Sequence, residues 1–70
     1  MEEWFFGHFR WKTAEPPWIS LLNFVNRHGV QPEDIVIIGS GADQMPGENQ
    51  KVGFVRFMYY AEAELEDSTN

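Results

Sequence analysis

The chain has 70 residues, of which 16% are aromatic, and it carries a formal net charge of −6 and no cysteine. This length predicts one small domain of marginal stability, and the lack of cysteine excludes disulfide bonds and thiolate metal sites. The acidic balance argues against a large phosphate-tracking surface and favours a partner with a basic surface, or simple solubility.

The start of the chain lacks the pattern of a secretory signal. It begins with Met1-Glu2-Glu3 and continues directly into a strand-like segment, whereas a signal peptide has a basic start followed by an apolar run. No apolar stretch approaches the ~18 residues that a membrane-spanning helix needs. We therefore expect a soluble, cytoplasmic protein that does not bind membranes.

Residues 4–13 alternate in the manner of a half-buried strand rich in aromatic side chains. The odd positions are the more apolar set and are expected to face the helix: Phe5, Gly7, Phe9 and Trp11. The even positions combine two aromatic residues with a basic run: Trp4, Phe6, His8, Arg10 and Lys12.

Residues 16–29 have the period and the end signals of an amphipathic helix. Pro16 and Pro17 suit the first turn, and Gly29 suits a left-handed C-terminal cap. Helical spacing predicts one apolar stripe, which packs against the sheet and consists of Trp18, Leu21, Leu22 and Val25, widened by Ile19 and Phe24. The opposite, polar side is predicted to hold Ser20, Asn23, Asn26 and Arg27.

The second half of the chain predicts two further strands. Residues 31–34 form a proline turn, and residues 35–38 form a short β-branched strand. Residues 39–51 are expected to form a long hairpin loop, and a last strand runs from 52 to about 61. The prediction is an α+β fold, a single β-α-β-β domain with one helix on a three-stranded, largely antiparallel sheet. Its ordered core covers about residues 4–62, and the acidic tail, 63–70, frays.

One face of such a sheet has no helix to cover it. An exposed apolar patch of several hundred Å² generally marks an interaction site. Here the first and last strands would both place aromatic groups on it. The alternative is that two copies bury these faces against each other as a structural homodimer.

The last strand resembles part of the RNA recognition motif, a β-α-β-β-α-β fold that binds single-stranded RNA. Gly53-Phe54-Val55-Arg56-Phe57 matches the final five positions of its third-strand consensus. Sheet aromatics stack unpaired bases in that family. The resemblance, which covers about residues 4–60, implies stacking by Phe5 and Phe54 with Arg56 beside them, although alternation favours burial of Phe5. Tyr60 is expected on the same contact face.

No catalytic or metal-binding pattern is found. His8 and His28 are the only imidazoles, and nothing in their spacing brings them together with carboxylates. Ser20 and Ser40 are not flanked by the residues that mark a nucleophile. We expect a protein that is not an enzyme and needs no metal or cofactor.

Three functions remain. The first is a small acidic protein that binds a basic, nucleic-acid-handling protein and inhibits it; in size and charge the chain is similar to phage-encoded inhibitors such as anti-CRISPR proteins. Its partner-binding carboxylates would be Glu33, Asp34, Asp43, Glu48, Glu62 and Glu64. The second is a reduced RNA-binding module, and the third is a structural homodimer. Acids clustered on one face favour the first, and basic and aromatic groups sharing the sheet face favour the second.

Overall fold

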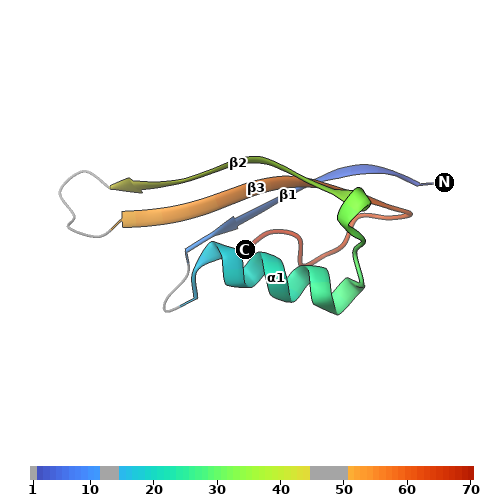
Figure 1. The fold of residues 1–70 in the computed structure, drawn as a ribbon, viewed down its shortest axis with the longest axis horizontal. Helices are drawn as coiled ribbons and strands as arrows, with labels where there is room; N and C mark the ends of the chain where they lie inside the picture. The colour runs from blue at the N-terminus through green and yellow to red at the C-terminus, as the bar shows by residue number, and fades with distance from the viewer. Residues whose placement is uncertain (1, 12–14, 45–50) are drawn as a thin grey trace.

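The computed structural model describes residues 2–11, 15–44 and 51–70, with side chains for all of these except 42–44, 51 and 52. The elements follow the order β1 (Glu3–Arg10), α1 (Pro17–His28), the short 3-10 helix η1 (Pro32–Asp34), β2 (Ile35–Gln44) and β3 (Lys51–Ala61). Figure 1 shows α1 on one face of the sheet and no element on the other. The predicted α+β fold, β-α-β-β with one helix on three strands, is confirmed.

The sheet has the order β1-β3-β2, and both of its strand pairs are antiparallel. Strand β2 is longer than predicted, because residues 39–44 continue the ladder that was expected to become a loop. The glycines and serine in this segment look like a turn, yet pairing with β3 holds them extended. A bulge between Ile37 and Gly39 leaves Ile38 without a partner in β3.

The core lies between α1 and the odd-numbered positions of β1 and β3, as alternation predicted for β1. It consists of Phe9, Leu21, Phe24, Val55, Phe57 and Tyr59. Gly7 is required at its place because a Cβ atom there would lie 2.2 Å from Cζ of Phe57. The ring of Phe57 therefore occupies the space that any side chain at position 7 would need.

Helix α1 starts and ends where the sequence predicted, but it buries a different stripe. Gly29 has a φ of 62°, and the amide of Val30 donates to the carbonyl of Val25 at 3.1 Å, which closes the last turn. The buried residues are Pro17, Ser20, Leu21 and Phe24. Ser20 was expected on the polar side, whereas Trp18, Ile19 and Leu22, expected in the core, are about half exposed at 51%, 44% and 53%.

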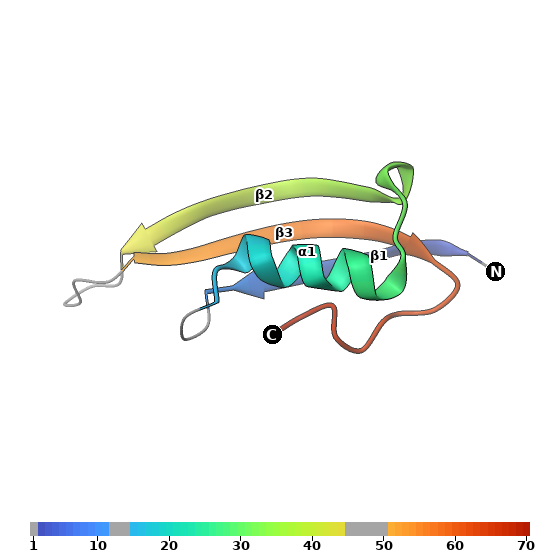
Figure 2. The same cartoon turned by 60° about the horizontal axis from the view of Figure 1, so that its bottom comes forward.

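The reason is the position of the helix under the sheet. Helix α1 packs on β1 and β3 and leaves β2 largely uncovered. Figure 2 shows α1 between the C-terminal segment on one side and β2 on the other. Arg27 contacts the C-terminal segment, so helical geometry turns the opposite flank, with Trp18 and Leu22, towards β2. The exposed part of the apolar stripe, Trp18 and Leu22, therefore has no described element packed on it.

The C-terminal segment does not fray, so that prediction is wrong. The amide of His8 donates to the carbonyl of Ser68 at 2.9 Å, and the amide of Asn70 donates to the carbonyl of His8 at 3.3 Å. The amide of Leu65 donates to the buried hydroxyl of Tyr59 at 2.9 Å. The acidic composition of this segment gives no hint of these partners, which lie far away in the sequence.

Asp67 connects the C-terminal segment to the last turn of α1. Its carboxylate pairs with Arg27 and accepts a hydrogen bond from Nε2 of His28 at 2.7 Å. Burial raises the pKa of Asp67, but the hydrogen bonds from His28 and Arg27 outweigh it, and the pKa lies below its usual value. No helix in the described ranges is long and apolar enough to span a membrane.

Candidate functional site

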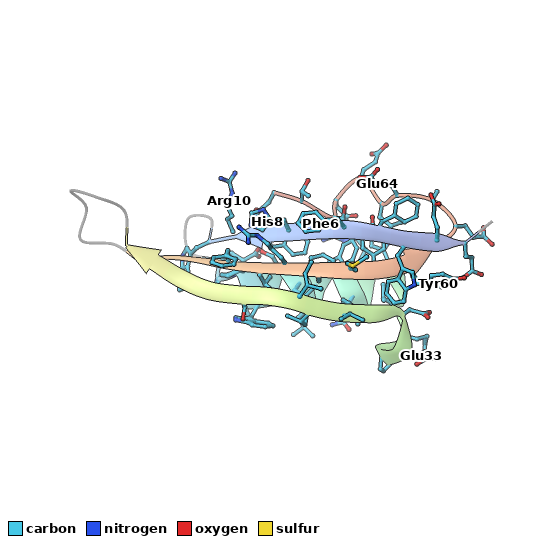
Figure 3. The ribbon with its side chains drawn as sticks, turned by 90° about the horizontal axis from the view of Figure 1, so that it is seen from above. Phe6, His8, Arg10, Glu33, Tyr60 and Glu64 are labelled. Carbon is cyan, nitrogen blue, oxygen red and sulfur yellow. The ribbon has the colours of Figure 1, made fainter. Side chains whose placement is uncertain are left out.

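The face of the sheet opposite α1 is the candidate site, and we call it the open face. It is built by the even-numbered residues of β1 and β3 with their neighbours on β2: Trp4, Phe6, His8, Arg10, Phe54, Arg56, Met58, Tyr60 and Val36. Figure 3 looks down on this face and shows Phe6, His8 and Arg10 in sequence along β1. Alternation places them there, because successive side chains of a strand point to opposite faces.

One end of the open face is apolar. Trp4 pairs with Tyr60, and their ring centroids are 5.4 Å apart. The next rung joins Phe6, Met58 and Val36 across the three strands. Trp4 is 43% exposed, Phe6 50% and Val36 48%, so these side chains offer apolar surface to solvent.

The other end is basic and aromatic. His8 lies opposite Arg56, and Arg10 lies opposite Phe54. The guanidinium carbon of Arg56 is 4.8 Å from the centroid of the Phe54 ring, within the range of a cation–π contact. The guanidinium plane and the aromatic ring together form a mixed surface of the kind on which bases stack.

His8 lies between the two ends. Its ring centroid is 6.4 Å from that of Phe6 and 6.3 Å from that of Phe54. Burial, with smaller contributions from the positive charges of Arg56 and Arg10, lowers the pKa of His8, so the imidazole is neutral at pH 7. Its Nε2 atom is buried and has no hydrogen-bond partner among the described residues.

Strand β2 contributes little bulk to the basic end. Gly39 pairs with Arg56, and Gly41 pairs with Phe54. A Cβ atom at Gly39 would meet nothing within 4 Å, whereas at Gly41 it would lie 3.3 Å from Cε1 of Phe54. Gly39 therefore places no side chain beside Arg56 on the open face.

The structure brings three of the four predicted sheet-face residues together, namely Phe54, Arg56 and Tyr60. Phe5 is not among them: it lies on the helix side, where it packs against the core with its ring centroid 5.7 Å from that of Tyr59. The position carried over from the RNA recognition motif is therefore wrong for Phe5, and alternation was the better guide. The neighbouring Phe6, which lies on the open face, was omitted from the predicted site.

The predicted partner-binding carboxylates whose side chains are described lie outside the strands that form this face. Glu33 and Asp34 belong to η1, and Glu62 and Glu64 follow β3. Figure 3 shows Glu33 and Glu64 at the same end but beyond opposite edges of the sheet, so they do not form one patch. Glu48 and the side chain of Asp43 fall outside the part of the chain that is described.

A shallow hollow between α1 and the C-terminal segment holds the other polar groups. It is lined in part by Glu15, Ser20, Arg27 and Asp67. These groups are already paired, since the hydroxyl of Ser20 donates to Glu15 at 2.6 Å and Arg27 pairs with Asp67. No cluster of three or more His, Asp or Glu residues that could hold a metal ion occurs in the ranges the structure describes.

Comparison of the chain with models of known protein families, with curated proteins and with solved structures gave no match.

Proposed function

We propose that this protein is a non-catalytic module that binds single-stranded RNA on the open face. The observation that carries the proposal is charge segregation. Every charged side chain of the open face is basic, although the chain as a whole has a net charge of −6. This holds over Trp4 to Arg10, Val36 to Gly41 and Phe54 to Tyr60. A ligand with aromatic bases and negative phosphates complements such a surface.

Each end of the open face has a distinct part in this proposal. Phe6, Trp4 and Tyr60 present exposed rings on which bases can stack, and stacking is worth about 1–3 kcal/mol per base. Arg10 and Arg56 supply positive charge for phosphates. With only two arginines on the face, the dependence of affinity on salt should be shallow, with a slope of about −1.4 in log K against log salt.

The test is fluorescence anisotropy with a labelled single-stranded RNA of mixed sequence, and with the same RNA as a duplex. We expect saturable binding to the single strand and none to the duplex, whose bases are already stacked. Phe6→Ala should weaken binding by about 5- to 150-fold, the range of one stacked base. Leu22→Ala is the matched control, because Leu22 is equally exposed but lies on the helix.

Two results would overturn the proposal. One is the absence of any binding at low salt and high protein concentration. The other is an equal loss of affinity in the Phe6 and Leu22 variants, since only Phe6 lies on the open face.

A second candidate function rests on three exposed carboxylates outside the open face. Glu33, Glu62 and Glu64 are all exposed, and none of them forms an ion pair with another described residue. Such carboxylates could steer the protein to a basic surface of a nucleic-acid-handling protein and inhibit it. Binding of an oligolysine peptide that is lost in a Glu33→Gln, Glu62→Gln, Glu64→Gln variant, with RNA binding unchanged, would favour this function. The open face is less suited to it, because its own charges are basic.

A further inference from the structure

The two outer edges of the sheet differ in how far their backbone hydrogen bonds are satisfied. Along β1, the C-terminal segment satisfies the backbone at His8, and the side chain of Asn70 bonds the amide and the carbonyl of Arg10, both at 2.9 Å. Along the outer edge of β2, no hydrogen bond reaches the backbone from any described residue. Strand β2 therefore presents a row of unpaired backbone donors and acceptors, which is a template for another strand.

The sequence of β2 does not protect this edge. Residues 35–41, Ile-Val-Ile-Ile-Gly-Ser-Gly, contain neither charge nor proline, the usual means by which natural proteins block an edge. Val36, Ile37 and Ile38 are 48%, 43% and 49% exposed. The bulge at Ile38 is the one protective feature, and the residue that it leaves without a partner is itself β-branched and half exposed.

We propose that β2 pairs antiparallel with β2 of a second copy of this chain, around a twofold axis, to give a continuous six-stranded sheet. An uncharged segment that meets itself brings no like charges together, whereas a charged partner strand would find nothing complementary along residues 35–41. The acids Glu33 and Asp34 precede β2, so antiparallel pairing places those of the two copies at opposite ends of the new ladder.

The hydrogen bonds along the outer edge of β1 bear on the number of copies in the assembly. The C-terminal segment occupies that edge at His8 and Arg10, so β2 is the edge that stays open along its described length, and pairing through it around a twofold axis closes after two copies. A twofold interface of this kind gives a dimer and not a filament. Pairing at the edge leaves the open faces of both copies free and side by side, so this inference does not depend on the proposed RNA binding.

The test is the mass in solution, by light scattering after size exclusion, over a range of concentrations. We expect wild-type protein to approach twice the 8.2 kDa of one chain, more completely at higher salt because screening weakens the repulsion between two acidic chains. Ile38→Lys should give a monomer with unchanged circular dichroism. Leu22→Lys, at an equally exposed position on α1, and Phe6→Ala, on the open face, should both remain dimeric.

A second measurement does not depend on any variant folding well. Hydrogen exchange of the wild-type backbone amides in residues 35–41 should slow as the protein concentration rises. A wild-type monomer at all concentrations, or a dimeric Ile38→Lys protein, would overturn the proposal. A dimer that dissociates only in Leu22→Lys or only in Phe6→Ala would also overturn it, by placing the contact on the helix flank or on the open face.

Discussion

The two faces of the sheet are made by alternate residues of the same strands, and both are aromatic, yet they differ in what surrounds the rings. On the helix side, Phe9, Phe24 and Phe57 pack on one another with centroids 5.4–5.7 Å apart, and Gly7 makes room for them. On the open face, arginine and histidine lie between the rings. Aromatic content alone therefore does not distinguish a core from a binding surface; the small or charged neighbours do.

The largest difference in the free energy of unfolding is expected between two variants, one that loses a ring from the helix side and one that loses a ring from the open face. Phe57→Ala should lower the free energy of unfolding by about 3–5 kcal/mol, because the fully buried ring leaves a cavity. Phe6→Ala should change it by no more than about 0.5 kcal/mol, as is usual at the surface. Urea denaturation measures both, and a Phe57 variant that is unfolded without urea agrees with the prediction. Equal losses in the two variants would contradict it.

A smaller difference in stability is expected between two variants that add a methyl group, one on each face. Gly7→Ala forces Cβ against the buried Phe57 ring and should destabilise the protein by about 1–3 kcal/mol. Gly39→Ala meets nothing within 4 Å and should change the free energy of unfolding by less than about 0.5 kcal/mol. Thermal midpoints compare the two. If Gly39→Ala were the more damaging, the assignment of the crowded face would be wrong.

The smallest effect is a dependence on pH near 6.5, which the open face should show through His8. The pKa of His8 is lowered in the folded state, first by burial and then by Arg56 and Arg10, from an ordinary value of 6.5. The unfolded chain therefore binds the proton more readily, so stability falls as the pH drops through 6.5 and levels off below the folded-state pKa.

Urea denaturation between pH 5 and pH 8 tests this expectation, since imidazoles titrate in that range. His8→Phe should remove the fall in stability near pH 6.5. His28→Gln is the matched control, because His28 lies on the helix side, and it should retain the fall. A His8→Phe protein with the wild-type pH profile would show that the imidazole does not titrate as described.

The sequence predicted the order of elements, the ends of α1 and the face to which β1 turns each residue, because these depend on local chemistry and on alternation. It did not predict the length of β2, since Gly39, Ser40 and Gly41 favour a turn and only pairing with β3 extends them. It also did not predict that Trp18 and Leu22 stay exposed, because the position of α1 under two strands is set by the whole sheet. For the site, alternation placed Phe6 on the uncovered face but the predicted site omitted it, whereas the resemblance named Phe5, which lies on the helix side.

The strand order has a consequence for folding kinetics. The central strand, β3, is the last in the chain: it pairs locally with β2, where Gln44 meets Lys51, but with β1 only across most of the sequence, where Glu3 meets Ala61. Closing the long loop costs more entropy, so the β2–β3 hairpin should form first and the docking of β1 should limit the rate.

Until β1 docks, the hairpin exposes both of its edges, and the C-terminal segment has no strand to cover. Substitutions within the hairpin should then slow folding, whereas those in the C-terminal segment should mainly speed unfolding.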